Sequence, residues 1–286
     1  MAYKPSPRPR FDSATHIPYA GVTQHLWGDE ESGLVADWCY VSTDKIHQLV
    51  LGLPPGAAFR HSTEYKTIFA ADELYYVLSG EMALANPATG EVQVAKMGES
   101  FFFRKDTWHH GFNIGTTPLR VLEILAPPPS QGSCGEYALN QPDLEKRIYS
   151  QENILCRWPT ALNEVRDGDS IQVLRDGDIN WRLEGDTQEL LVGILVSTEH
   201  LTVAKGCLLP GQNTPLRSHS GDQSIYVLDG ILNIRVPDSE GQKWFEVHPA
   251  DGFYLPEGVT YQFFNGLDTP ARFIFGVAPD YREAKN

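Results

Sequence analysis

Two stretches in the first half of the chain carry side chains that can do chemistry. One begins at Glu73 and reads Glu-Leu-Tyr-Tyr-Val-Leu-Ser-Gly, and the other ends at Asn113 and reads Asp-Thr-Trp-His-His-Gly-Phe-Asn. An inward-facing carboxylate beside an imidazole can exchange protons or hold a metal ion. We therefore expect the chemistry of this half to centre on Glu73 and His109.

Short strands must position these side chains. Alternation places Glu73, Tyr75 and Val77 on one face of a strand that ends in a tight turn. Further strands are expected at residues 82–85, 91–95, 101–103 and 119–125, with turn residues between them. His110 directly follows His109 and should point to the opposite face. This segment is therefore predicted to be an antiparallel meander.

The second half of the chain repeats the pattern. The matching pairs of segments are 73–80 with 223–230, 41–44 with 196–199, and His109 with Tyr261. Repeated segments in the same order indicate a duplicated domain. The first copy carries five additional residues between Gly56 and Glu73.

Composition excludes several classes of function. The 286 residues are 41% hydrophobic and 21% charged, with a formal net charge of -14 and no basic stripe. Neither a nucleic acid nor an anionic membrane is therefore an expected partner. The four cysteines stand singly, which argues against a zinc ribbon and a disulfide framework. The sequence has no signal segment and no apolar run of about 18 residues, so we expect a cytoplasmic protein.

Many short strands and little helical periodicity indicate an all-β protein built of two small, jelly-roll-like β-barrels. We expect a Pro-rich extended arm at residues 1–35, a first domain at 36–128, a connecting segment at 129–188 and a second domain at 189–286. A short helix is expected to begin at Pro142. The arm should pack on the other half or on a second subunit, and open strand edges favour a homodimer.

Several residues keep intervals that resemble the two sequence motifs of the cupin superfamily. In the first copy these are Glu73 and Gly80, which end the first motif, and Gly98, His109 and Asn113 of the second. In the second copy they are Gly211, Arg217, His219, Gln223 and Gly230 of the first motif, and Pro256, Gly258 and Asn265 of the second. The chain is therefore similar to a bicupin, with two tandem cupin domains at about 36–128 and 190–280.

The resemblance implies a divalent transition metal, such as Fe, Mn, Ni or Zn, held by imidazoles and a carboxylate. Glu73 and His109 stand at two of the ligand positions. The additional residues of the first copy would let a loop deliver His61 as a third ligand. The predicted metal site is therefore His61, Glu73 and His109.

Direct counting leaves Thr67 and Phe69 at the other ligand positions, and neither is a usual metal ligand. An alternative without metal therefore stays open. In it, His109 is a hydrogen-bonded core residue, Glu73 is paired with an arginine (Arg60 or Arg104), and His61 lies on the surface.

The second copy places Arg217, His219, Gln223 and Tyr261 at the four ligand positions. A guanidinium repels a metal ion, so no metal is expected there. The set can offer hydrogen bonds to a carboxylate or a sugar, and Arg217, His219 and Tyr261 are also candidate catalytic residues. The remaining alternative is an inert domain kept for folding or for dimer contacts.

The leading hypothesis is a metal-dependent enzyme whose first domain acts on a small oxygenated organic compound. Dioxygenase, isomerase, lyase and decarboxylase chemistry all stay open. Tyr75, Arg104 and Gln223 are the predicted substrate-binding residues. One alternative is a metal-free protein that binds an anion or a sugar in the second domain. Another is a metal-free enzyme in which His219 or His109 acts as an acid or a base.

Overall fold

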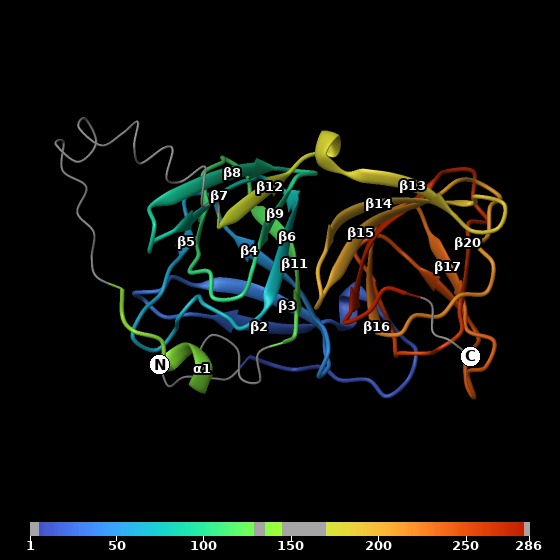
Figure 1. Cartoon of the computed structure of the whole chain (residues 1–286), viewed down its shortest axis with the longest axis horizontal. Helices are drawn as coiled ribbons and strands as arrows, with labels where there is room; N and C mark the ends of the chain where they lie inside the picture. Colours follow the sequence, from blue (N-terminus) through green and yellow to red (C-terminus); the bar gives the residue numbers. More distant parts are fainter. Residues whose placement is uncertain (1–5, 129–134, 145–169, 283–286) are drawn as a thin grey trace.

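The computed structural model describes residues 6–128, 135–144 and 170–282, which form two β domains side by side (Figure 1). Each domain combines a seven-stranded antiparallel sheet with a smaller one. The all-β prediction is confirmed, and each domain is jelly-roll-like, but the sheets do not close into barrels. Because the sheets pack face to face, the inner face of each large sheet lines the interior of its domain.

The larger sheet of the first domain contains β2 (Thr23–Trp27), β3 (Val35–Ser42), β4 (His47–Leu53), β6 (Asp72–Ser79), β9 (Ser100–Phe103), β11 (Leu119–Ala126) and β12 (Ile171–Leu174). Their order is β12-β9-β6-β11-β4-β3-β2. The smaller sheet contains β5 (Ala58–Phe59), β7 (Glu81–Asn86), β8 (Glu91–Lys96) and β10 (His110–Asn113), in the order β5-β10-β7-β8. The strand that begins beside Glu73, β6, therefore lies near the centre of the larger sheet.

The larger sheet of the second domain contains β1 (Thr15–Ile17), β13 (Asn180–Glu184), β14 (Leu190–Ser197), β15 (Thr202–Leu208), β16 (Asp222–Asp229), β19 (Gly252–Leu255) and β21 (Ala271–Ala278). Their order is β1-β19-β16-β21-β15-β14-β13. The smaller sheet contains β17 (Leu232–Arg235), β18 (Trp244–Val247) and β20 (Gln262–Phe264), in the order β18-β17-β20. The two large sheets thus have the same arrangement, as the sequence repeat predicts.

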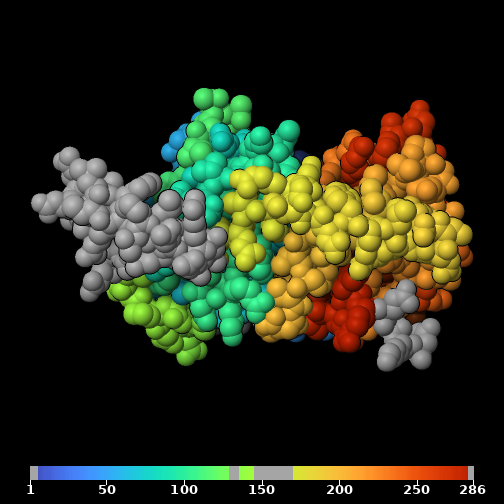
Figure 2. Space-filling view, turned by 45° about the horizontal axis from the view of Figure 1, so that its top comes forward, coloured from blue at the N-terminus to red at the C-terminus, as the bar shows by residue number. Residues whose placement is uncertain are grey.

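The two domains exchange edge strands. β1, from the N-terminal arm, pairs with β19 of the second domain, and β12, from the connecting segment, pairs with β9 of the first. Figure 2 shows the segment that contains β12 and β13 (yellow) running across both domains. The predicted boundaries therefore shift: β2 lies within the predicted arm but belongs to the first domain, and β13 lies within the predicted connecting segment but belongs to the second.

Helical structure within the described residues is limited to short turns. They are η1 (Tyr19–Gly21), α1 (Glu136–Leu139) and η3 (Asp176–Asp178). The helix predicted to begin at Pro142 is not found over the described residues 142–144, and α1 is a different short helix that ends before them, with Ala138 packed against Ile68 and Trp108. Residues 145 and 146 of the predicted helix lie outside the described residues.

The outer faces of the two large sheets pack on each other. Tyr40, Leu74 and Ile124 of the first domain share one buried apolar cluster with Tyr226 and Ile274 of the second. Alternate residues of the same strands face inward and form a separate core in each domain. The domain interface therefore holds β6 and β11 rigidly from outside, while their inner faces carry the candidate site.

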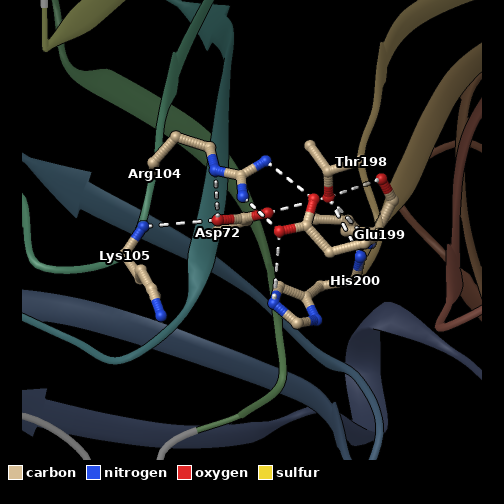
Figure 3. A network of polar contacts seen from close by, with 7 residues as sticks. Asp72, Arg104, Lys105, Thr198, Glu199 and His200 are labelled. Atoms are coloured by element: carbon tan, nitrogen blue, oxygen red, sulfur yellow. Dashed lines mark hydrogen bonds and ion pairs between the residues drawn. The ribbon is translucent and has the colours of Figure 1, made fainter.

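Polar contacts flank this apolar interface. Thr198 donates from its hydroxyl to Asp72 at 2.7 Å, and the equivalent Thr43 of the first domain donates to Asp222 at 2.8 Å. Figure 3 shows the first of these contacts, where Arg104 forms ion pairs with Asp72 and Glu199. The two halves therefore meet through a roughly symmetrical set of contacts.

Candidate active site in the first domain

Acidic side chains and a phenol face the interior of the first domain. Tyr75 on β6 lies directly opposite Glu123 on β11, and Glu73 is the next residue along the same face. Asp37 on β3 reaches the same interior from beyond β4. All four residues are buried, with exposed fractions of 1% for Glu73, 2% for Tyr75, 6% for Asp37 and 7% for Glu123. The predicted inward face of Glu73 and Tyr75 is therefore observed.

A cavity of ≈ 90 Å³ occupies this interior, which is room for a few waters or one small molecule. Its polar wall residues are Ser6, Arg8, Asp37, Ser42, His47, Thr67, His109 and Glu123. Its aromatic and aliphatic wall residues are Trp27, Val35, Leu49, Leu51, Phe59, Phe69, Tyr75 and Leu125. Arg8 comes from the N-terminal arm, and its Nε lies 3.1 Å from the hydroxyl of Ser42. The arm therefore forms part of the cavity wall.

His109 lies just before β10 and points toward β6. Its Nδ1 is 3.1 Å from the carbonyl oxygen of Thr107, and its Nε2 is 3.2 Å from the hydroxyl of Tyr75. A carbonyl only accepts hydrogen bonds, so the neutral ring carries its proton on Nδ1, and Nε2 accepts from Tyr75. The same Nε2 lies 4.0 Å from Oε2 of Glu73. The Glu73 carboxyl and the His109 imidazole thus face each other.

Burial shifts both pKa values of this pair toward the neutral forms. Burial, with smaller effects of Glu123 and Asp72, raises the pKa of Glu73 well above its usual value. Burial lowers the pKa of His109 to about 4, although the Thr107 carbonyl opposes this shift. At neutral pH the carboxyl therefore keeps its proton and the imidazole stays neutral. Glu73 is a potential proton donor and His109 a potential proton acceptor.

The other two acidic residues are shifted in the same direction. Burial raises the pKa of Glu123 to about 8, although the neighbouring hydroxyl of Tyr75 opposes this rise. Burial and the nearby Glu123 raise the pKa of Asp37 well above its usual value. Burial, Glu123 and Glu73 likewise raise the pKa of the Tyr75 phenol. The interior therefore has acidic groups that resist ionisation because water is excluded from them.

The donor set does not fit a divalent metal. Within the described part of the chain, no group of three His, Cys, Asp or Glu side chains lies close enough to hold a metal ion. Thr67 and Phe69, which stand at the other two ligand positions, line the cavity with His109, and their side chains are poor metal ligands. Phe69 fills the space beside the imidazole, with its ring centre 5.9 Å from that of His109.

His61, the predicted third ligand, has a different partner. Its Nδ1 lies 2.7 Å from Nε2 of His110, and its ring also contacts Trp108. His110 and His109 are adjacent and point to opposite faces, as the strand period predicts. His61 is therefore held on the His110 side, and the structure does not form the three-residue metal site expected from the sequence.

Arg104, a predicted substrate-binding residue, lies outside the cavity. Its Nε is 3.2 Å from Asp72, and its Nη1 is 3.0 Å from Glu199 of the second domain (Figure 3). Arg104 directly follows β9, and its side chain points to the domain boundary. This placement corrects the prediction and also removes Arg104 as a partner of Glu73.

The four predicted residues of the second domain come together. The hydroxyl of Tyr261 lies 2.8 Å from Nε2 of His219, and Nδ1 of His219 lies 2.7 Å from the carbonyl oxygen of Tyr281. Gln223 is buried beside them. Burial and Arg217 lower the pKa of His219 to about 4.

Arg217 itself is paired within the domain. Its Nη2 lies 2.5 Å from Glu184, which also accepts a hydrogen bond from the Tyr281 hydroxyl at 2.8 Å. Burial opposes ionisation of Glu184, but its bonds with Arg217, Tyr281 and Arg182 outweigh that effect and lower its pKa. The guanidinium predicted to bind an anion is therefore already neutralised by a carboxylate of the same domain.

The sequence analysis missed Asp37 and Glu123. The duplication carried a signal for both, because the second copy has Val192 in place of Asp37 and Phe275 in place of Glu123. An acidic residue inside an apolar strand, where the other copy has an apolar one, indicates a role specific to the first copy. Spacing rules for metal ligands do not use this difference.

Fold and site together define a protein with two tandem jelly-roll domains and an acid-lined cavity in the first. The Cupin domain family matches residues 51–125 and 205–277, just over half of the chain, and the chain therefore belongs to the cupin family. The sequence matches no curated protein. Within the described residues, no helix is long and apolar enough to cross a membrane.

Solved structures share the whole architecture. The putative glyoxylate induced protein of Pseudomonas aeruginosa matches with a TM-score of 0.65 and 17% identity, over 100% of this chain and 96% of its own. Oxalate decarboxylase of Lactobacillus farciminis, in a formate complex, matches with a TM-score of 0.63 and 13% identity, over 97% and 90%. Oxalate decarboxylase of Bacillus subtilis, a protein with Mn(II) centres, matches with a TM-score of 0.62 and 15% identity, over 97% and 81%. At these identities the similarity shows the fold alone.

Proposed function

We propose that the protein is an acid–base enzyme of the isomerase or lyase type, which moves a proton on a small molecule bound in the first domain. The observation that carries the proposal is the facing pair of Glu73 and His109, with Oε2 and Nε2 4.0 Å apart beside a cavity. The cavity of ≈ 90 Å³ suits a small substrate.

The protonation states of the pair support this chemistry. His109 is neutral at Nε2 and accepts a proton from the substrate, while the protonated carboxyl of Glu73 donates one to another substrate atom. The step leaves a carboxylate beside an imidazolium, and these two charges stabilise each other in the buried site. Return of the proton from His109 to Glu73 restores the starting state, so the cycle needs no oxidant.

The same residues argue against a metal centre like the Mn(II) centres of Bacillus subtilis oxalate decarboxylase. Two strong ligand groups, one carboxyl and one imidazole, are too few to hold a divalent ion firmly. The hydroxyl of Tyr75 already donates to Nε2 of His109, the atom that would face a metal. The proposal therefore places the chemistry in the acid–base pair.

Hydrogen exchange with solvent tests the proposal. The protein is incubated in D₂O, with a chelator, with a panel of small hydroxy, oxo and amino compounds, and loss of substrate C–H signals is followed by proton NMR. We expect exchange or conversion of at least one compound. His109→Asn and Glu73→Gln should each slow it by about 10²-fold or more, the usual effect of removing an acid or base.

The surface variants His248→Asn and Glu246→Gln are matched controls, because these side chains are about half exposed in the second domain. They should react at the rate of the unmodified protein. If exchange is lost in His219→Asn but retained in His109→Asn, the active site lies in the second domain and the proposal is wrong. Exchange that stops on chelation would show that a metal is required after all.

A further inference from the structure

Asp37 and Glu123 are buried carboxyls that no Lys or Arg among the described residues neutralises. Within the described part of the chain, no Lys or Arg forms an ion pair with either residue. Arg8 lies on the wall of the same cavity, but its guanidinium bonds to Ser42 and Thr43 at the end of the β3–β4 turn. Buried acidic groups are costly unless they are paired, so this arrangement needs a reason.

The fold itself does not require these acids. The second domain has Val192 and Phe275 at the equivalent positions of equivalent strands. Both are part of its apolar core, which also contains Phe273 in ring contact with Phe275. The same architecture is thus stable with apolar residues there, and the two carboxyls in the first domain serve something other than packing.

The remainder of the cavity wall suits a positive charge. Trp27, Phe59, Phe69 and Tyr75 surround the space, and aromatic faces attract cations through their quadrupoles. The hydroxyl of Thr67, a residue only 3% exposed that lines the same cavity, has no hydrogen-bond partner among the residues that the structure describes. A bound ammonium group can donate to this oxygen as well as to the carboxyls.

We propose that the cavity of the first domain binds a small organic cation, a primary amine or ammonium compound, between the carboxyls of Asp37 and Glu123. This inference names the substrate class of the proposed acid–base site and rests on that proposed function. The cation supplies the charge that the two acids lack. The aromatic walls exclude water and strengthen that attraction, and the cavity volume restricts the ligand to a short chain.

Three probes of one size separate charge from shape. Propylammonium, 1-propanol and propionate are titrated into the protein, with isothermal calorimetry and thermal stability as readouts. We expect saturable binding of propylammonium, with a Kd at least tenfold lower than that of 1-propanol and no detectable binding of propionate. Propionate binding as tight as that of propylammonium, or no binding of any probe, would overturn the inference.

Isosteric variants locate the site. Asp37→Asn and Glu123→Gln should each weaken propylammonium binding at least tenfold, while Glu81→Gln, an exposed acid on β7, should not change it. Retention of full affinity in both cavity variants would contradict the proposed site. Their melting temperatures check that they fold, and removal of an unpaired buried acid should not lower them.

The variant His109→Asn separates this inference from the proposed function. It should still bind propylammonium saturably and more tightly than 1-propanol, although His109 lines the same cavity, because the imidazole is not one of the charged partners. If His109→Asn abolishes catalysis but the unmodified protein binds no cation, the acid–base function is supported and the proposed amine ligand is overturned. If the protein binds the cation but His109→Asn keeps full catalysis, the amine site is supported and the proposed acid–base function is overturned.

Discussion

Glu123 of the first domain and Phe275 of the second occupy the same position on equivalent strands. Glu123 faces Tyr75 across β11 and β6, and Phe275 faces Ile225 across β21 and β16. Phe275 fills its core, whereas Glu123 adjoins a cavity. At this position the duplicated architecture thus has an apolar residue in the second domain and an ionisable one in the first.

Stability should fall as pH rises if Glu123 is buried as described. Its pKa is raised to about 8 in the folded protein, so the folded chain binds one more proton than the unfolded chain between about pH 4.5 and 8. Asp37, whose pKa is also raised, adds a slope of the same sign. We expect Glu123→Gln to raise the free energy of unfolding at pH 8 by on the order of 3 kcal/mol, and by little at pH 5.

Urea unfolding at several pH values between 5 and 8 measures this difference. The other titratable groups near Glu123 are Asp37, Glu73, Tyr75 and Cys39, and burial raises the pKa of each, which favours the neutral form. Glu81→Gln is the control. It removes an exposed carboxyl, so its free energy of unfolding should vary with pH as that of the unmodified protein does. Equal slopes in Glu123→Gln and the control would show that Glu123 is ionised in the folded state.

Metal ions should have little effect on folding. Because only Glu73 and His109 face each other, we expect Mn²⁺ at millimolar concentration, or a chelator, to shift the melting temperature by less than about 1 °C. Differential scanning calorimetry and elemental analysis of the purified protein provide the measurements. If Mn²⁺ raises the melting temperature by several degrees and His109→Ala abolishes this effect, the metal site predicted from the sequence would be supported.

Arg217 should be a stabilising residue of the second domain. Arg217→Met leaves Glu184 without its buried cationic partner and should lower the free energy of unfolding by about 3 kcal/mol. The double variant with Glu184→Gln should recover part of that loss, because it removes the orphaned charge. Arg235→Met, an exposed arginine of the same domain, is the matched control. A loss no larger than that of the control would mean that Arg217 is free to bind a ligand.

The interface between the domains should depend on its buried hydroxyl contacts. Thr198→Val removes the hydrogen bond to the fully buried Asp72 and should lower the free energy of unfolding by about 1–2 kcal/mol. Glu199→Gln weakens only exposed contacts, with Arg104 and His200, which solvent screens, so it should lower the stability by less than Thr198→Val does. Chemical unfolding of both variants compares the two effects, and equal losses would contradict this ranking.

The sequence determined the duplication, the β class and the inward face of Glu73 and Tyr75, because repeats and alternation are local properties of the chain. It also brought Glu73 and His109 into the same site through a spacing that resembles cupins. It failed for His61 and Arg104, since the partner of a loop or strand-end side chain depends on segments distant in sequence. The imidazole of His61 contacts that of His110, and the guanidinium of Arg104 bonds to Glu199 of the second domain.

Only the tertiary structure decided what the first domain contains. Asp37 and Glu123 lie on strands separated by β4, and their shared cavity exists only when β3, β4 and β11 pair in register. The exchange of β1 and β12 between domains likewise follows from pairing between distant segments. Local patterns fix which way a side chain points, but burial, and with it the protonation of an acid, is set by everything packed around it.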